Sequence, residues 1–318
     1  MKFEDLTEKL TSIFLRWEVN SDVACSVAKN MAKAHLYGHA THGVQLLPRY
    51  HRWLFNFKIL NKDPVLEVDS TESPLIKINA HRSFGHWALP TIINKCAKMA
   101  SPIKAFQVQR LGHTGYVAEC LRQSNVEDHI VLLWINTSGS KLVRPYNGTD
   151  KMMSTSVFAA LTPGGYVVDM STTSTAENSV HYNLMSNKEL AAGCLALGNG
   201  DLTTNPKDLY VETPNGLNAM QSEAAILFKD HKMFNLGILA EILAGLYTGS
   251  GTSRNEYFYS GCFGVMLKTN SEFGTKVQSY LNWIKNGPEV RLPGTLIADE
   301  IVLQPWEQQI LDKFLLEF

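Results

Sequence analysis

The stretch Ile130-Val131-Leu132-Leu133-Trp134-Ile135 decides the class of fold, because it is short and apolar on both faces. Such a run predicts a central buried strand. Tyr166-Val167-Val168-Asp169-Met170 repeats the pattern. Before these runs, alternating apolar and polar residues predict strands at 65–68 and 75–78, and a short extended run predicts one at 105–108. Helical spacing predicts a helix at 87–99. Helices and strands that alternate in this way indicate an α/β protein.

Further out, the two ends of the chain are predicted to be helical. Asn20-Ser21-Asp22 forms a plausible cap for a helix whose apolar residues recur at helical spacing as far as Ala32. The chain then turns at Gly38 and Gly43, and Pro48 can open another short helix. Towards the end, the sequence predicts a strand at 264–267, a helix through 277–284 and a last helix from Pro305.

Three further stretches carry distinct expectations. Residues 136–151 and 193–218 contain too many glycines and prolines for regular structure, so we expect long loops of the kind that line sites. Residues 234–246 are nearly all apolar apart from Glu241, which predicts a helix buried on most sides. We expect an N-terminal helical segment at 1–60, an α/β cofactor- and substrate-binding core at 61–268 and a C-terminal helical segment at 269–318.

Composition excludes several classes of function. The chain has 318 residues with 29 Lys plus Arg and 30 Asp plus Glu, a formal charge of −1, so it offers no basic field to nucleic acid or to an anionic membrane. Its five cysteines are scattered, which argues against a disulfide framework or a zinc ribbon. The acidic N-terminus does not resemble a signal peptide, and no apolar run is long enough to span a bilayer. We therefore expect a cytoplasmic protein.

Histidines supply the first candidates for chemistry. His35, His39 and His42 would share one helical face if the helix persisted, but Gly38 and Gly43 argue against it, so a helix C-terminus is favoured over a metal site. No metal is predicted. Thr41-His42-Gly43 places a histidine at a chain reversal, where its ring can reach a cleft. His113 is predicted to follow a strand and open a helix, where it could meet an anion or serve merely as the neighbour of an N-cap.

A carboxylate and a run of hydroxyls form the second group of candidates. Asp169 ends a predicted buried strand, a position suited to orienting a histidine, and Ser171-Thr172-Thr173-Ser174-Thr175 follows it. A capping box or a solvated loop explains the same residues without any function. The chain contains no GxGxxG, GxxxxGK[ST], HExxH or GxSxG motif, so common nucleotide-binding and hydrolase folds lose their usual support.

The order of these pieces resembles the malate/L-lactate dehydrogenases of the second, non-Rossmann type, a family that includes sulfolactate, ureidoglycolate and diketogulonate dehydrogenases and cyclic-imine reductases. The landmarks, in order, are 34–50 (AHLYGHATHGVQLLPRY), 82–86 (RSFGH), 111–116 (LGHTGY), 167–171 (VVDMS), 203–206 (TTNP), 241–245 (EILAG) and 291–294 (RLPG). The resemblance implies a homodimer with a non-Rossmann α/β fold, in which a largely antiparallel or mixed sheet is flanked by helices and the helical N- and C-terminal segments pack together.

The resemblance also implies the site. His42, beside Thr41, matches the family's proton donor, and Asp169 matches the aspartate that partners it. A carboxylate partner would raise the pKa of the histidine. Leu46, Arg49 and Tyr50 fall in the substrate-binding segment. The residues expected to line the dinucleotide site are His113, Ser171, Thr172, Thr173, Ser174, Thr175, His231, Lys232, Pro293, Gly294 and Thr295.

Several positions depart from the family pattern. Leu46 stands where the family usually has an arginine that binds the substrate carboxylate. Thr41 replaces a serine, Met153-Ser154-Thr155-Ser156-Val157 stands in place of Gly-Thr-Asn-Pro, Met233 replaces a glycine, and Thr295 replaces an acid. The lost arginine indicates a substrate whose carboxylate is masked, absent or held elsewhere.

The leading hypothesis is an NADPH- or NADH-dependent reductase of a C=N or C=O bond in a small or biosynthetic-intermediate substrate, with His42 as the proton donor. The alternatives are a malate- or lactate-type 2-hydroxy acid dehydrogenase, with Arg49 or Arg52 replacing the lost arginine, and a dimeric binding protein that has lost the chemistry.

Overall fold

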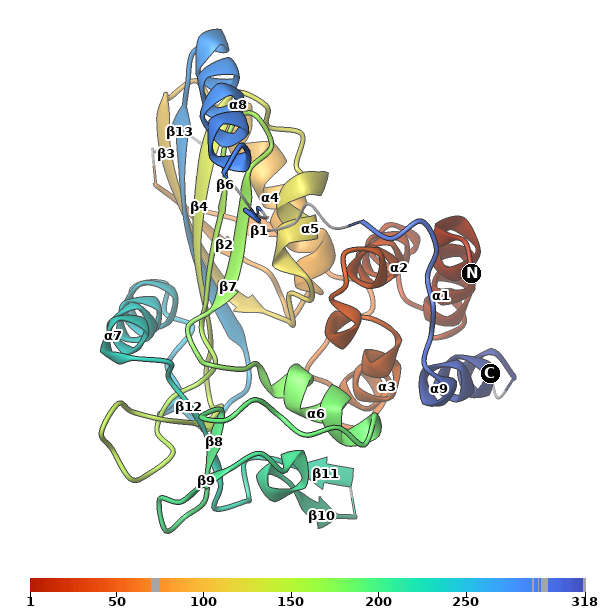
Figure 1. The fold of residues 1–318 in the computed structure, drawn as a ribbon. Coiled ribbons are helices and arrows are strands. Elements are labelled where there is room, and N and C mark those ends of the chain that lie inside the picture. The colour runs from red at the N-terminus through yellow and green to blue at the C-terminus, as the bar shows by residue number, and fades with distance from the viewer. Residues whose placement is uncertain (70–74, 215, 288, 291, 293–296, 317–318) are drawn as a thin grey trace. The chain divides into compact units, whose positions relative to one another are not determined.

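The computed structural model describes residues 1–69, 75–214, 216–287, 289–290, 292 and 297–316 (Figure 1). They form two compact units. Unit 1 comprises Met1–Leu133, Ala159–Asp169 and Phe263–Phe318, and unit 2 comprises Trp134–Phe158 and Met170–Cys262. The three consecutive segments expected from sequence remain a prediction. The unit boundaries fall within strands rather than in linkers, so no change of composition marks them.

Helices from both ends of the chain pack together in unit 1, as predicted. They are α1 (Phe3–Arg16), α2 (Ser21–Leu36), α3 (Leu47–Phe55) and α9 (Pro305–Leu316). The Asn20 side chain caps α2 by accepting a hydrogen bond from Asp22 N, and Pro48 lies in the first turn of α3. Trp17, which follows the C-terminus of α1, packs edge-on against Phe14 and Phe314, with ring centroids 5.2 and 5.4 Å away. This apolar core ties the last helix to the first.

A seven-stranded sheet has the order β1-β2-β3-β13-β4-β6-β7. Its strands are β1 (Glu67–Val68), β2 (Leu75–Asn79), β3 (Ile103–Leu111), β4 (His129–Thr137), β6 (Val157–Leu161), β7 (Val167–Ser171) and β13 (Ser260–Lys268). The sheet is mixed, because β1 and β2 are antiparallel whereas β2 and β3 are parallel, with Leu75 opposite Ala105. Helices α4 (Gly85–Ala97) and α5 (Val117–Gln123) lie together beside the sheet (Figure 1). The mixed, helix-flanked α/β fold is confirmed.

The strand at the centre of the prediction is β4. Val131, Leu133 and Ile135 are buried, whereas Ile130, Leu132 and Trp134 on the other face are half-buried. One of the two neighbours of β4 in the sheet is β13, which comes more than a hundred residues later in the chain. Gly264 lets β13 approach closely, because a Cβ there would lie 2.0 Å from Phe106 of β3.

Unit 2 corrects two expectations about loops. The glycine- and proline-rich stretches contain short strands: β5 (Val143–Arg144), β8 (Leu195–Ala196) and β9 (Leu202–Thr203) join β12 (Ala225–Leu227) in a four-stranded sheet. A hairpin of β10 (Val211–Thr213) and β11 (Gly216–Asn218) follows the 3-10 turn at Pro206–Leu209, and α6 (Glu177–Met185) precedes β8. The prediction of no regular structure was wrong, because pairing between strands, some close in the chain and some distant, compensates for low local propensity.

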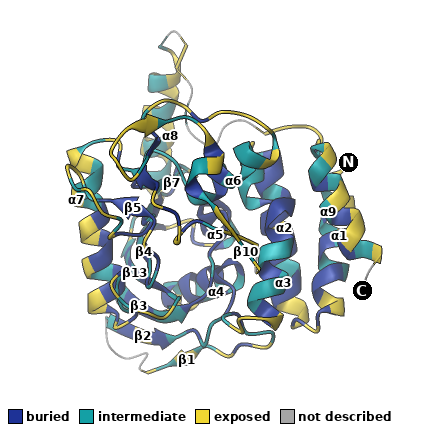
Figure 2. Cartoon of the chain, turned by 90° about the horizontal axis from the view of Figure 1, so that it is seen from below, coloured by how far each residue is buried: buried dark blue, intermediate teal, exposed yellow. Residues whose placement is uncertain are grey.

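The apolar helix at 234–246 also differs from its prediction. It is α7 (His231–Ala240), continued by a π-helical turn at Glu241–Tyr247. The prediction that this helix is buried on most sides was wrong, since Leu239, Ile242 and Leu246 are 40%, 45% and 65% exposed. Figure 2 shows exposed residues along α7. The buried residues of the π-helical turn are instead Glu241, Ala244 and Gly245.

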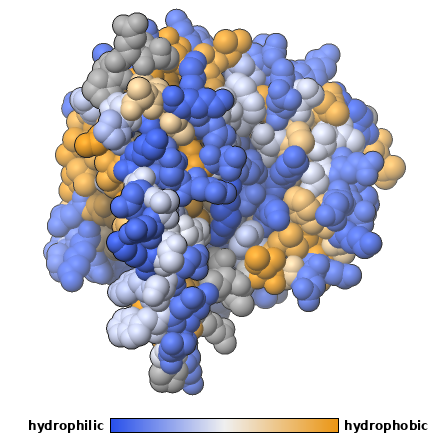
Figure 3. All heavy atoms as spheres, turned by 90° about the horizontal axis from the view of Figure 1, so that it is seen from above, coloured by the Kyte–Doolittle hydropathy of each residue, from blue (hydrophilic) through white to orange (hydrophobic). Residues whose placement is uncertain are grey.

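The surface combines polar and apolar residues. Figure 3 shows hydrophobic patches set among hydrophilic side chains on one face. Helix α8 (Ser271–Lys285) has no buried residue, and its Tyr280 and Trp283 are 61% and 70% exposed. Over the described ranges, none of the helices combines the length and apolar character that crossing a membrane requires.

Candidate active site

Three histidines meet around one tyrosine in unit 1. Tyr50 Oη lies 2.8 Å from His113 Nδ1 and 3.2 Å from His86 Nε2, and both Tyr50 and His86 are fully buried. The rings of His42 and His113 are nearly parallel, with centroids 6.4 Å apart. Because a hydroxyl carries a single proton, Tyr50 can donate to only one of its two histidines and must accept from the other. Tyr50, His86 and His113 therefore form a connected polar network inside the fold, and the His42 ring stacks beside it. We call these four residues the histidine cluster.

Close backbone approaches set the positions of these rings. Gly85 N donates to His113 O (2.9 Å), which links the start of α4 to the segment after β3. Gly115 adopts a positive φ of +61°, and a Cβ there would lie 2.0 Å from His86 Nε2. Gly115 therefore leaves room for the His86 imidazole, whereas Gly85 leaves room for Thr114. His113 lies four residues before α5, so it does not itself open that helix.

The segment that carries His42 is not helical throughout. Helix α2 ends at Leu36, and two 3-10 turns follow at Ala40–His42 and Val44–Leu46. His35 closes this bend by accepting a hydrogen bond from Val44 N (3.1 Å). The three histidines 35, 39 and 42 therefore do not share one helical face. Among the residues whose placement is described, no group of histidine, cysteine and acidic side chains could hold a metal ion.

Burial makes the histidines of the cluster weak bases. It lowers the pKa of His42 to about 4 and that of His86 to about 3, and it holds the pKa of His113 well below the usual value. The positive charge of Arg49 lowers the pKa of both His42 and His113 further. All three rings are consequently neutral at neutral pH. His42 Nδ1 lies 3.1 Å from the hydroxyl of Thr41.

The carboxyl of Asp169 is bound elsewhere than expected. Asp169 Oδ2 accepts a hydrogen bond from Ala118 N in the first turn of α5 (2.8 Å). Burial raises the pKa of Asp169 to about 6, although this backbone bond and the charge of Arg122 oppose the rise. No hydrogen bond connects Asp169 to His42 within the described residues, so their expected partnership is not formed in this structure.

The substrate-binding candidates separate into core and site residues. Leu46 is 1% exposed and belongs to the apolar core of the N-terminal helices. Tyr50 supplies the hydroxyl at the centre of the cluster. Arg49, on α3, is close enough for its charge to act on His42, His113 and Tyr50. Arg49 is therefore the one of these three candidates that brings a positive charge to the cluster.

His86 is the site residue that sequence reasoning did not select. It lies in the landmark 82–86, immediately before the predicted apolar helix 87–99, so the feature that could have identified it was a histidine next to an apolar segment. An isolated histidine of that kind is usually a satisfied core residue. Only the fold brings it to Tyr50 and His113.

The hydroxyl run expected to line the dinucleotide site is largely committed to internal bonds. Ser171 Oγ and Thr173 Oγ1 lie 2.7 Å apart, Thr173 Oγ1 donates to Thr175 O (2.8 Å), and Thr172 Oγ1 donates to Ser156 O (3.2 Å). Ser174 Oγ donates to Leu227 O (2.8 Å). The hydroxyl of Thr175 makes no hydrogen bond to a described residue, so it alone in the run keeps its donor available.

The His231–Lys232 pair begins α7 in unit 2. The Asp230 carboxylate caps this helix by accepting from Lys232 N and Met233 N at 2.9 Å, so these two backbone donors are already used. The exposed Lys232 ammonium remains able to meet an anion. Ser156, in the segment that departs from the family pattern, has a buried hydroxyl with no hydrogen-bond partner. Pro293, Gly294 and Thr295 lie outside the described residues.

Together, a mixed sheet flanked by helices, a buried histidine cluster and the absence of a GxGxxG turn from the sequence define a non-Rossmann α/β protein with a site suited to proton transfer. The chain belongs to the malate/L-lactate dehydrogenase family, whose sequence model matches residues 1–299. It is accordingly an NAD(P)-dependent oxidoreductase, and its cofactor is a nicotinamide dinucleotide.

Individual relatives differ in the substrates that their names give. The chain is 24% identical to hydroxycarboxylate dehydrogenase B of Escherichia coli K12, over 90% of this chain and 82% of that one. It is also 24% identical to Delta(1)-pyrroline-2-carboxylate reductase of Agrobacterium fabrum, over 82% and 74% of the two chains. The crystal structure of delta1-piperideine-2-carboxylate reductase from Pseudomonas syringae superposes with a TM-score of 0.83 and 19% identity, covering 99% of each chain. The family thus includes both hydroxy-acid dehydrogenases and cyclic-imine reductases.

Proposed function

We propose that the protein reduces a C=N or C=O bond of a small carboxylate-bearing substrate, with His42 as the proton donor. The observation that carries this proposal is the position of His42, next to the Thr41 hydroxyl, stacked on His113 and within the field of Arg49. The nicotinamide would supply the hydride, and the Thr175 hydroxyl and Lys232 would hold part of the dinucleotide. Reduction places negative charge on the substrate nitrogen or oxygen, which a nearby imidazolium can neutralise.

A pKa of about 4 leaves His42 neutral before the substrate binds. A substrate carboxylate would change that, because its negative charge would offset Arg49 and favour the protonated imidazole. Protonation of His42 is then coupled to substrate binding. Neutral molecules would bind without bringing the proton, which favours substrates with an acidic group.

Arg49 is proposed as the group that binds this carboxylate, in place of the arginine that the family usually has at position 46. A guanidinium can form two parallel hydrogen bonds to a carboxylate, which leucine cannot. The position of Leu46 in the apolar core of the N-terminal helices supports this reassignment. Asp169 is proposed to orient the protonated imidazole after a change of partner from Ala118 N.

The substitution His42→Asn tests the proposal. We expect kcat to fall by about 10²–10⁴-fold with a cyclic imino acid or 2-oxo acid, because a positioned acid contributes that much. Binding of NADPH, measured by its effect on the melting temperature, should not change. The matched control is His51→Asn on α3, whose ring packs on Trp17 and Phe55 away from the cluster. Unchanged turnover in His42→Asn would exclude His42 as the acid.

Oxidation of a malate- or lactate-type 2-hydroxy acid is the second candidate function, favoured by the family model itself. The two candidates use the same residues in opposite directions. Rates with malate and lactate plus NAD or NADP, compared with rates of imine and ketone reduction, decide between them. A third possibility is a binding protein without turnover. Thermal-shift titrations with NADPH, NADH, NADP and NAD separate it from both, because a dinucleotide that binds only the folded state raises the melting temperature.

We further propose that the enzyme is a cytoplasmic homodimer that uses NADPH. Its five cysteines are all free thiols, which suits a reducing compartment. The exposed apolar residues of α7 and the π-helical turn, among them Leu239, Ile242 and Leu246, are typical of a surface that a second copy covers. Light scattering should give the mass of a dimer, and Ile242→Glu should convert it to a monomer. A monomeric wild type would refute the dimer.

A further inference from the structure

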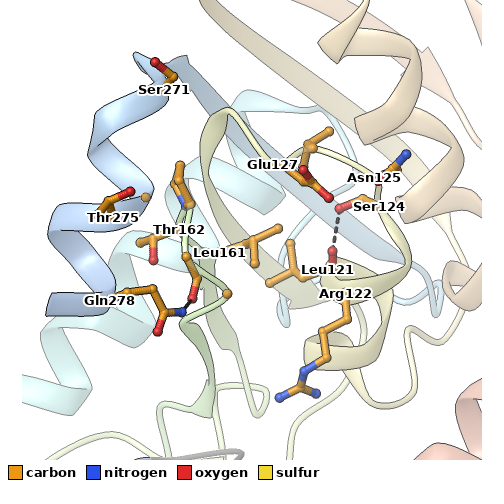
Figure 4. A pocket seen from close by; sticks show the side chains of 15 residues that line it. Leu121, Arg122, Ser124, Asn125, Glu127, Leu161, Thr162, Ser271, Thr275 and Gln278 are labelled. Atoms are coloured by element: carbon orange, nitrogen blue, oxygen red, sulfur yellow. Dashed lines mark hydrogen bonds between the residues drawn. The ribbon is translucent and has the colours of Figure 1, made fainter. Parts of the chain in front are cut away.

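A hollow outside the histidine cluster lies between α5 and α8 in unit 1. Its volume is about 750 Å³, within the range of small-molecule sites. In Figure 4, α8 forms one wall with Ser271, Thr275 and Gln278, and the end of α5 with the loop after it forms the other. Leu161 and Thr162, from the end of β6, lie between the walls. We name this hollow, together with its smaller neighbour, the α5–α8 groove.

Glycines bring the base of the groove together. The turn between β6 and β7 contains Gly164 and Gly165, both with positive φ, and a Cβ at Gly164 would lie 2.8 Å from Gly274 O of α8. Gln278 Nε2 donates to Gly164 O and fixes the helix to the turn. The base is therefore built by backbone contact and does not depend on exposed side chains alone.

Positive charge gathers at one end of the groove. Arg122, Gly164, Gly165 and Gln278 also line the neighbouring hollow of about 230 Å³, to which Lys285 contributes. The Arg122 guanidinium stacks over Tyr37 at 4.2 Å and donates to Tyr116 Oη at 3.3 Å. Neither Arg122 nor Lys285 forms an ion pair with any residue that the structure describes. Two cations at one end of a cavity, neither of them in an ion pair, favour an anion there.

The other end of the groove carries a negative charge, from Glu127. In Figure 4, Glu127 and the Arg122 guanidinium lie toward different ends of the hollow. A ligand with an acidic group at each end would place one of them beside the Glu127 carboxylate, where like charges repel. A ligand with one acidic group and a hydrogen-bond donor at its other end matches both ends.

We propose that the α5–α8 groove binds a small organic anion, with its phosphate or carboxylate against Arg122 and Lys285 and an amino or hydroxyl group toward Glu127. Arg122 also acts electrostatically on Asp169, which the proposed function places in the reaction. An anion in the groove would offset that charge and weaken its hold on the ionised Asp169. The ligand is therefore an effector whose site is separate from the histidine cluster, and this effect on turnover rests on the proposed function.

Calorimetric titration without dinucleotide tests binding by itself. The probes are phosphoethanolamine and γ-aminobutyrate, which distinguish a phosphate from a carboxylate, and phosphoglycolate, which is acidic at both ends. We expect saturable binding of at least one of the first two, weaker binding of phosphoglycolate, and the same affinities in His42→Asn. Absence of saturable binding of any probe up to about 10 mM would overturn the proposal, because a site weaker than that contributes under about 3 kcal/mol.

Variants locate the site. Arg122→Gln should weaken binding by about tenfold or more, as expected for loss of a charge-assisted contact. The matched control is Lys276→Gln, which removes a positive charge from α8 at a residue that does not line the groove. Thr275→Trp fills the hollow without touching Arg122, so it tests the site even if Arg122→Gln fails to fold. Equal affinity in wild type and Thr275→Trp would refute binding in the groove, whatever the outcome for His42.

Discussion

At the scale of single residues, Tyr50 holds the candidate site together. Its hydroxyl bridges His113 and His86, and the other ring nitrogen of His86, Nδ1, is buried without a hydrogen-bond partner. A buried polar network of this kind is stable only while its members stay paired. The hydroxyl thus also couples the tautomers of His86 and His113, because it donates to one ring and accepts from the other.

The substitution Tyr50→Phe should therefore lower the free energy of unfolding by about 1–3 kcal/mol, the usual cost of leaving buried polar groups unsatisfied. Urea denaturation at pH 7 measures this loss. The control is Tyr280→Phe, at a position that is 61% exposed, which should be neutral. Equal stability of Tyr50→Phe and the wild type would mean that the hydroxyl does not bridge the two histidines.

Asp169 shows how far a residue's role follows from its position in the sequence. The sequence predicted that Asp169 ends a strand, but β7 runs from Val167 to Ser171, so Asp169 lies in the middle of it. The hydrogen-bond partner of Asp169 could not be predicted from the sequence, because Ala118 N reaches the carboxyl only after α5 has packed against the sheet. The same burial that raises its pKa to about 6 is a property of that packing.

At the scale of elements, the π-helical turn after α7 is organised by one buried acid. Glu241 accepts hydrogen bonds from Ser154 Oγ and Ser253 Oγ at 2.8 Å, from Ser253 N at 3.1 Å and from Asn136 Nδ2 at 3.2 Å. The sequence marked Glu241 only as an exception in an apolar run. The structure shows the reason, because the carboxylate joins three segments of unit 2.

We expect Glu241→Ala to destabilise the protein by about 2–4 kcal/mol, because four donors lose their acceptor in a buried site. Glu241→Gln should recover only part of this, since its amide group would place donors against donors. Thermal and urea unfolding measure both variants. Glu272→Ala on exposed α8, which removes only a surface pair with Lys276, should change stability by no more than about 0.5 kcal/mol. A similarly small effect at Glu241 would contradict an organising role.

At the scale of the whole molecule, the neutral histidines make stability depend on pH. His35, His42 and His86 have pKa values of about 4, 4 and 3 in the folded protein, below the ordinary 6.5. Below pH 6.5 the unfolded chain therefore binds protons that the folded protein does not, and stability falls as pH falls. Asp169 acts in the opposite sense, because its raised pKa lets the folded protein bind a proton from about pH 6 downward. Three histidines outweigh one aspartate.

Between pH 7 and pH 5 the free energy of unfolding should thus fall by a few kcal/mol, at about 1.4 kcal/mol per pH unit for each group that titrates fully. Urea midpoints at pH 7, 6 and 5 measure the slope. This range lies above the ordinary titration of exposed carboxylates, so the histidines dominate it. A midpoint that stays constant or rises toward pH 5 would show that the cluster is not neutral in the folded state.

The sequence by itself determined the local elements of this protein. Capping at Asn20, Pro48 in the first turn of α3 and the apolar run of β4 act over a few residues, so propensity and periodicity reveal them. The order of landmarks likewise led to the family. Tertiary structure decided what depends on distant contacts: the place of β13 beside β4, the short strands of unit 2, the exposed face of α7, and the meeting of Tyr50, His86 and His113. Such contacts arise from the packing of segments far apart in the chain, and no local pattern of residues encodes the distance between them.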